Sequence, residues 1–252
     1  MEIIVTVLIA IVGLLAGMLV NYLADILPHH DRFIRPVCWH CGEMQPYLNY
    51  FVWPRRCSQC GKARRWRVWL VEVLAIVVAV WLWYNPHDRL AFFWAYALLA
   101  YFGFVIVMDM EHREVSLNIV GLLLGGVIGW LLHGWLDTLI GGLAGAGVML
   151  LLYYFGIFVV KQLSKWREEE TDEVALGLGD VYLAGVIGLL LGWPGIVAGL
   201  FLTVLLGGAI SLLLVVGMAL TKGVRAFTAI PYGPFLVIAA ALLLFFRDWF
   251  LF

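Results

Sequence analysis

The chain has 252 residues, of which 64% are hydrophobic and only 13% are charged, about half the charged share usual in soluble domains. With a mean hydropathy of +0.98, this composition excludes both an ordinary cytosolic globule and a disordered chain. The formal net charge of −1 gives no sign of a nucleic-acid partner, so the composition predicts a membrane protein that crosses the bilayer several times.

Eight apolar runs have about the 20 residues that a helix needs to cross the hydrocarbon core. Each run is bounded by a charged residue or by a break containing proline or glycine. The predicted spans are 2–24, 67–84, 90–108, 117–133, 138–160, 175–193, 195–218 and 233–250. The first run has no basic start and exceeds the apolar part of a signal peptide, so we expect a retained span.

The basic residues are distributed unequally among the connections between these spans. Fourteen of the sixteen Lys and Arg residues fall in the connections 28–67, 109–116, 161–174 and 219–232. Because loops rich in Lys and Arg stay in the cytoplasm, we expect these connections on the cytoplasmic side and both chain termini outside.

The long connection 28–67 contains all four cysteines, spaced C-x2-C-x15-C-x2-C: Cys38, Cys41, Cys57 and Cys60. Two such pairs, each followed by glycine, can hold a structural zinc ion tetrahedrally. Disulfides are the alternative, and a reducing compartment disfavours them. A closed four-thiolate site has no open position for a substrate, so we expect the metal to fold a segment too small to build its own core.

Basic and tryptophan side chains follow one another beside the cysteines. We interpret them as an interfacial patch facing anionic lipid headgroups, with nucleic acid as the less favoured partner. The residues are Arg55, Arg56, Lys62, Arg64, Arg65 and Arg67 with Trp53, Trp66 and Trp69.

Ionisable residues at membrane depth are costly and therefore candidates for function. Glu72 lies one turn into the second span, Asp109 ends the third, and Asp180 lies near the start of the sixth. Asn21 and Asp25 share one face at the cytoplasmic end of the first span, where we favour an interfacial polar face over a catalytic role.

Only 13 residues follow Asp180 in the apolar run, from Val181 to Trp193, which is about 20 Å of helix and too short to cross the core. The span is therefore expected to begin before Asp180. Gly177 and Gly179 allow unusual dihedral angles and close backbone approach, which favours a kink or a notch that accepts a peptide.

Each aspartate also has a structural explanation, a helix N-cap for Asp180 and a stop at the water interface for Asp109. Together, two carboxylates on the same side of the membrane can share one proton, an arrangement suited to water-mediated peptide hydrolysis. The alternatives are a proton or cation transporter using Glu72, Asp109 and Asp180, and a silent anchor that recruits partners through the zinc module.

Several motifs together resemble one family, the bacterial prepilin peptidases. Gly177-Leu178-Gly179-Asp180 looks like the GxGD motif of intramembrane aspartyl proteases. The stretch from Gly17 to Pro28, the paired cysteines, Asp109 and the segment Pro231-Tyr232-Gly233-Pro234-Phe235 resemble the other motifs of the family in the same order. From the residues alone, the last segment is more simply a turn at a helix entry, with a binding loop as the alternative.

The resemblance implies an all-α membrane protein of about eight transmembrane helices with a small cytoplasmic zinc-binding domain between helices 1 and 2. Residues 1–27 would form the first helix, 28–67 the zinc-binding domain and 68–252 the peptidase domain. Asp109 and Asp180 would be catalytic, Gly177 and Gly179 would support the active site, and zinc would be bound by the ligands Cys38, Cys41, Cys57 and Cys60.

The expected partners are membrane lipids and type IV prepilins or pseudopilins, recognised by their leader peptide and N-terminal hydrophobic helix. The family cleaves the basic leader after a glycine at the cytoplasmic face of the bacterial inner membrane. Many members then methylate the new N-terminus with S-adenosylmethionine, so this donor is an expected second cofactor.

Overall fold

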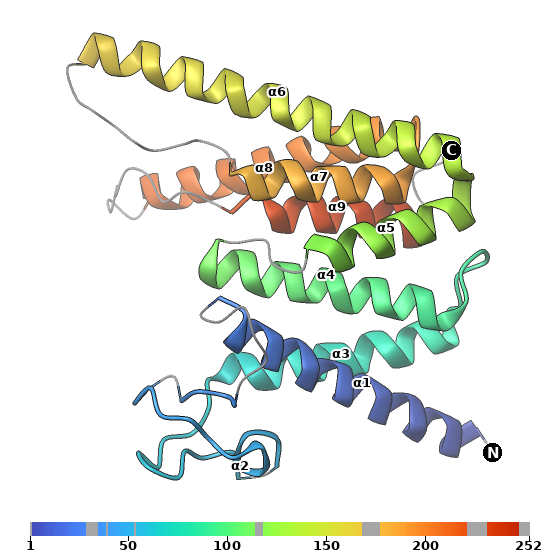
Figure 1. Ribbon diagram of the computed structural model, residues 1–252, viewed down its shortest axis with the longest axis vertical. Coiled ribbons are helices and arrows are strands. Elements are labelled where there is room, and N and C mark those ends of the chain that lie inside the picture. Colours follow the sequence, from blue (N-terminus) through green and yellow to red (C-terminus); the bar gives the residue numbers. More distant parts are fainter. Residues whose placement is uncertain are drawn as a thin grey trace. The chain divides into compact units, whose positions relative to one another are not determined.

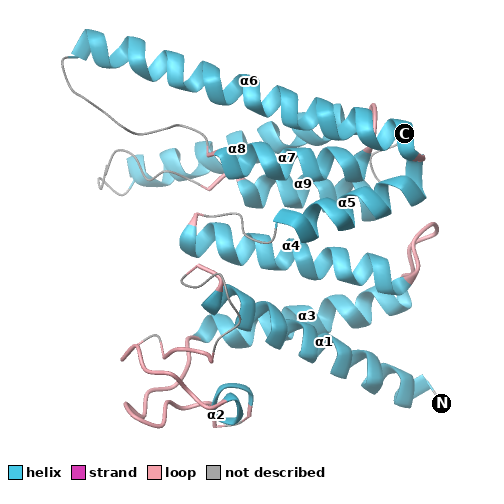
Figure 2. Cartoon of the chain, in the orientation of Figure 1, coloured by secondary structure: helices cyan, strands magenta, loops and turns pink. Residues whose placement is uncertain are grey.

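The computed structural model describes residues 2–28, 35–38, 40–52, 54–113, 118–167, 177–220 and 231–246. These residues fold into helices joined by loops, as Figure 2 shows. The helices are α1 (Glu2–Ile26), α2 (Tyr47–Phe51), α3 (Trp66–Tyr84), α4 (Phe92–His112), α5 (Asn118–His133), α6 (Trp135–Arg167), α7 (Leu178–Leu191), α8 (Gly195–Leu220) and α9 (Gly233–Phe245). Parts of the predicted connections (29–34, 114–116, 168–174 and 221–230) and end residues of three predicted spans (117, 175–176 and 247–250) lie outside the described residues.

Each predicted span corresponds to one described helix. Five of these helices, α1, α3, α4, α6 and α8, are long and apolar enough to cross a membrane, and α5, α7 and α9 are shorter apolar helices. The prediction of a helical membrane protein is therefore confirmed. The short helix α2 in the cysteine-containing segment was not predicted.

The chain divides into two compact units, Met1–Ser116 and Leu117–Phe252. The first unit contains α1 to α4 and the segment between α1 and α3, which we call the cysteine module and which is described over 35–38, 40–52 and 54–65. The predicted division into a zinc-binding domain (28–67) and a peptidase domain (68–252) is a division by function and stays a prediction.

In the first unit, α1 packs along α3, and both contact α4 (Figure 1). The α1 surface at this contact is made of glycine: a Cβ atom at Gly13 would lie 2.7 Å from the Cα of Ile76, and one at Gly17 would lie 2.8 Å from the Cα of Glu72. Small residues four positions apart let two membrane helices approach closely. This packing brings the end of α1 and the start of α3 together at the cysteine module.

In the second unit, α7 is the central helix and contacts α5, α6, α8 and α9. Its contact with α6 is backbone against backbone, because a Cβ at Gly188 would lie 2.2 Å from the carbonyl oxygen of Gly141, and one at Gly145 would lie 2.3 Å from that of Ala184. Eight residues of α7 are buried. The first turn of this enclosed helix carries Asp180.

Candidate functional site: a four-cysteine centre and two aspartates

The four cysteines of the cysteine module form one cluster, in which all Sγ atoms lie within 4.8 Å of one another. The Cys38–Cys60 and Cys41–Cys57 Sγ pairs are each 3.7 Å apart. All four thiols are free. Four ligands about 2.3 Å from a zinc ion stand about 3.8 Å from one another in a tetrahedron, so the observed spacing fits zinc.

Two similar turns position these thiols. Gly42 donates its N–H to the carbonyl oxygen of Cys38, and Gly61 does so to Cys57, at 2.8 and 3.0 Å. Both glycines have a positive φ, +74° and +68°, a conformation that other residues adopt only with strain. The glycine after each cysteine pair is therefore a requirement of the turn.

The surroundings shift the thiols of the cluster in opposite directions. Despite a hydrogen bond from the Glu43 backbone, the pKa of Cys41 rises to about 12, because burial and the other three thiols outweigh that bond. The backbone N–H groups of Cys60 and Gln59 hydrogen-bond to the sulfur of Cys57 and lower the pKa of its thiol to about 6. Since zinc binds the thiolate, the turn at Cys57 favours the metal-binding form near neutral pH.

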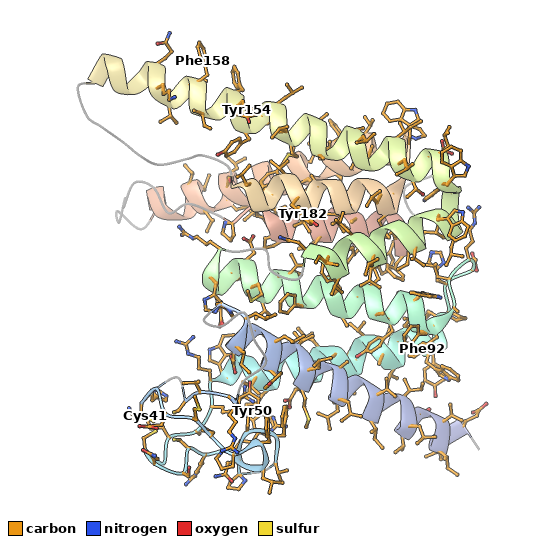
Figure 3. All side chains as sticks on the ribbon, in the orientation of Figure 1. Cys41, Tyr50, Phe92, Tyr154, Phe158 and Tyr182 are labelled. Carbon is orange, nitrogen blue, oxygen red and sulfur yellow. The ribbon has the colours of Figure 1, made fainter. Side chains whose placement is uncertain are left out.

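A polar network fastens the cysteine module to the helix ends. Asp25, at the end of α1, accepts hydrogen bonds from the Tyr50 hydroxyl at 2.5 Å and from Arg64 at 2.7 Å. Arg67, at the start of α3, pairs with both Asp25 and Glu111. Burial and the charge of Asp25 raise the pKa of Tyr50, which keeps this hydroxyl a donor. Figure 3 labels Tyr50 and Cys41, both in this module.

Asn21 also helps to connect the end of α1 to the start of α3. Its side chain is fully buried, and its amide donates to the carbonyl oxygen of Val68 at 3.1 Å. The bond ties the last turns of α1 to the first turn of α3. The sequence predicted that Asn21 and Asp25 belong to an interfacial polar face. It did not predict that Tyr50, Arg67 and Glu111 form a hydrogen-bond and ion-pair network with them.

The carboxylate of Glu72 is paired with Arg55 and does not line a proton or cation path. The Nη1 atom of Arg55 donates to both carboxylate oxygens, at 2.7 and 2.8 Å, and the two side chains are only 7% and 4% exposed. This finding removes the first carboxylate of the alternative transporter pathway.

The same contacts correct the interpretation of the basic patch. Arg55, Arg64 and Arg67 turn toward Glu72 and Asp25, so they do not face lipid headgroups. Three of the six basic residues that the sequence assigned to one interfacial patch therefore form internal ion pairs.

Asp109 is buried, 5% exposed, in the last turn of α4. The helix ends at Arg113, whose left-handed backbone places its N–H on the carbonyl oxygen of Asp109 at 3.1 Å. Two residues after Asp109, Glu111 pairs with Arg67 and with Arg65. This end of α4 therefore lies beside the cysteine module.

Asp180 is the third residue of α7 and not its N-cap, which is Gly177, so the interpretation of Asp180 as the N-cap is wrong; its carboxylate instead reaches back to the N-cap backbone. Its Oδ2 accepts the N–H of Gly177 at 3.2 Å, and its own N–H donates to the Gly177 carbonyl oxygen at 3.1 Å. Gly177 has φ −84° and ψ 152°, an extended conformation that any residue adopts. The expectation that this glycine supplies an unusual dihedral angle is wrong, because the helix starts at Leu178 instead of kinking there.

The segment before α9 has the predicted helix-entry turn, with Pro234 in the first turn of the helix. Tyr232, just before it, is half-buried; burial raises the pKa of its hydroxyl, and the negative charge of Asp180 raises it further. This segment and Asp180 therefore lie within electrostatic range in the second unit. Asp109 belongs to the first unit, so the pairing of the two aspartates stays a prediction.

Two models of known protein families match the chain. Residues 93–212 match the type IV leader peptidase family, and residues 11–85 match the bacterial peptidase A24 N-terminal domain. The second match contains the cysteine module, and the first contains both Asp109 and Asp180. No solved structure matches the chain.

Several curated relatives carry the name prepilin leader peptidase/N-methyltransferase. The relative from Legionella pneumophila is 28% identical over 224 residues, which cover 85% of this chain and 73% of the relative. The relative from Aeromonas hydrophila is 27% identical over 238 residues, covering 89% and 76%, and that from Dichelobacter nodosus is 28% identical over 211 residues, covering 80% and 68%.

The two family matches follow one another along the chain, and the relatives align across most of it. Together with five helices able to cross a membrane, they indicate a bacterial inner-membrane enzyme. The chain belongs to the type IV leader peptidase family.

Proposed function

We propose that this protein removes the leader peptide of type IV prepilins or pseudopilins, cleaving after a glycine, through a dyad of Asp109 and Asp180. The observation that carries the proposal is the position of Asp109. It is a buried carboxylate at the end of the helix that Glu111 ties to the cysteine module. Its proposed partner opens the enclosed helix α7.

The chemistry needs one proton shared between the two carboxylates. When two such groups approach, the pKa of one rises while the other stays ionised. The ionised carboxylate takes a proton from water, whose oxygen attacks the scissile carbonyl carbon, while the protonated carboxylate donates to the carbonyl oxygen. Collapse of the tetrahedral species with protonation of the amide nitrogen then breaks the peptide bond.

The substrate geometry follows from the predicted topology. A prepilin whose hydrophobic helix stays in the bilayer presents its basic leader on the cytoplasmic side. We place the cysteine module and both aspartates on that side, and both termini on the other, because the basic connections flank them. Gly177, without a side chain, leaves room beside Asp180 for the substrate backbone, and Gly179 would contribute to the same notch.

We further propose that the four cysteines bind structural zinc, and that the new N-terminus is methylated with S-adenosylmethionine, as the names of the relatives suggest. When bound, this donor supplies an electrophilic methyl group. The zinc site, with four protein ligands and no open position, has a structural role.

Substituting either aspartate tests the peptidase assignment. Asp109→Asn and Asp180→Asn keep the side-chain volume but abolish the shared proton, so each should reduce prepilin cleavage by at least about a thousandfold, near the combined value of base and acid catalysis. Cleavage would be measured by mass spectrometry on a synthetic prepilin peptide with detergent-purified protein. Substantial cleavage by either variant, correctly inserted, contradicts the dyad.

A further inference from the structure

The short helix α2 of the cysteine module has an exposed apolar face. Leu48 and Val52, four residues apart and therefore on one side of the helix axis, are 73% and 55% exposed, and Tyr47 beside them is also exposed. Tyr50, on the opposite side from Leu48, is buried and donates its hydroxyl to Asp25. Neighbouring exposed apolar side chains mark an interaction surface, and neither the zinc site nor the proposed peptidase chemistry uses this one.

Aromatic contacts fix α2 against the end of α1. The ring centroid of Tyr22, on α1, lies 6.4 Å from that of Tyr47 and 5.9 Å from that of Phe51. The ring of Tyr50 is 6.0 Å away and perpendicular. Tyr22 precedes the end of α1 at Ile26 by four residues, about 6 Å along the helix axis. The helix α2 therefore lies beside the last turns of α1, as Figure 1 shows.

This position is at the level of the bilayer surface. The 25 residues of α1 are about 37 Å long, whereas the hydrocarbon core is about 30 Å thick. With α1 upright and centred, each end extends about 4 Å beyond the core, and Tyr22 lies within about 3 Å of the boundary. Contact with Tyr22 thus places α2 in the layer where amphipathic helices insert into a membrane.

The exposed face of α2 continues a stripe of exposed apolar side chains on α1. Leu8, Leu15 and Leu19 are each more than half exposed, and their spacing places them on one side of α1 together with Tyr22. Because α1 is long and apolar enough to cross a membrane, such a stripe contacts lipid acyl chains. The stripe leads to Tyr22, where the aromatic rings of α2 extend it onto the cysteine module.

We propose that α2 inserts into the surface of the bilayer, with Leu48 and Val52 in contact with acyl chains. On the topology proposed above, this contact holds the cysteine module against the cytoplasmic leaflet. A lipid surface is the favoured occupant because the face is continuous with the lipid-facing stripe of α1. The module also has exposed cations for the lipid phosphate groups, among them Arg56 and Lys62, and such residues are attracted to an anionic leaflet.

Site-directed spin labelling tests the insertion. A nitroxide attached through a noncanonical ketone residue, which spares the zinc-binding cysteines, would replace Leu48 in the full-length protein. The protein would be studied in nanodiscs of phosphatidylethanolamine and phosphatidylglycerol. Insertion predicts that oxygen, which concentrates in the bilayer, relaxes this label more strongly than a water-soluble nickel complex does, at a depth of about 5–10 Å.

Two other positions calibrate the measurement. The same label in place of Leu15 gives the lipid reference, and in place of Ser58, an exposed residue beside Cys57, the aqueous one. The cysteine cluster lies at the other end of the module from α2, as the labels of Cys41 and Tyr50 in Figure 3 show. Zinc content and thermal stability would report whether each labelled protein folds.

A label at position 48 with the accessibility of the Ser58 label overturns the proposal. So does a label that neither reagent reaches, because α2 would then be covered by protein, such as a second copy of this chain. If labelling at position 48 lowers the zinc content, a lipid-soluble carbene reagent tests the unaltered protein: insertion predicts modification of the peptide containing Leu48 and Val52, and modification of α1 alone overturns it. None of these readouts depends on prepilin cleavage or methylation, so their failure leaves the proposed function standing.

Discussion

The ion pair between Arg55 and Glu72 should be the most costly contact to break between the cysteine module and the membrane helices. Glu72 lies six residues into α3, about 9 Å along the helix. Both side chains are almost fully buried. Arg55 also donates from Nε to the Phe51 carbonyl oxygen, and its guanidinium lies 4.9 Å from the ring of Trp69. Arg55→Met would leave the Glu72 carboxylate buried without its cation.

Removing one partner of a buried pair costs about 3–5 kcal/mol, whereas replacing both by apolar residues of similar volume is often neutral. Methionine suits position 55 because it has no branch at Cβ, so the positive φ of 50° at this position is no worse accommodated than with arginine. We therefore expect Arg55→Met to lose about 3–5 kcal/mol of unfolding free energy, and Arg55→Met with Glu72→Leu to recover most of that loss.

These differences would be measured as free energies of unfolding in mixed detergent micelles, in which the fraction of denaturing detergent is increased stepwise. Arg56→Met is the matched control, because Arg56 is the exposed neighbour and its substitution should change stability by no more than about 0.5 kcal/mol. A cost below about 1 kcal/mol for Arg55→Met, the value of a surface pair, would refute the reasoning. So would a double variant whose loss is the sum of the two single losses, since coupled residues are not additive.

Two further variants test the metal centre and the proposed notch. Cys41→Ser, which removes the one exposed cysteine of the cluster, should lower bound zinc per chain and the melting temperature relative to Ser58→Ala; equal zinc in both contradicts a four-cysteine site. Gly177→Ala should fold normally, because its dihedral angles suit alanine and an added Cβ meets its nearest atom at 3.7 Å; we expect a raised KM for a prepilin peptide, and unchanged kinetics argue against a notch.

Helix positions could be predicted because a bilayer imposes a minimum apolar length. Helix ends were less predictable. The run ending at Trp193 led to a start near residue 175, whereas α7 begins at Leu178 and has 14 residues. A short helix is tolerated here because α7 contacts four other helices, and backbone groups buried in protein need not extend across the whole lipid thickness. In α6, conversely, the helix continues to Arg167, because helix formation does not stop where apolar composition does.

The zinc cluster was predictable because the turn and the ligand spacing are both local in sequence. The Asp25 network was not predictable, because its hydrogen-bonded partners are 25 to 44 residues apart in the sequence. Sequence alone shows that Arg64, Arg67 and Asp25 are charged and near the interface. Which charges face each other depends on the close packing of α1 on α3, which brings the end of one helix to the start of the other.

The scarcity of carboxylates at membrane depth identifies candidates without distinguishing their roles. Glu72 and Asp25 were noticed for the same reason as Asp109 and Asp180, yet they bind arginines of the cysteine module. These internal ion pairs also reduce the electrostatic attraction between the cysteine module and an anionic membrane surface. A basic residue near an anionic surface contributes about 1 kcal/mol of attraction, so the six residues predicted to face lipid would supply about 6 kcal/mol. With Arg55, Arg64 and Arg67 committed to internal pairs, about half of that attraction, about 3 kcal/mol, remains.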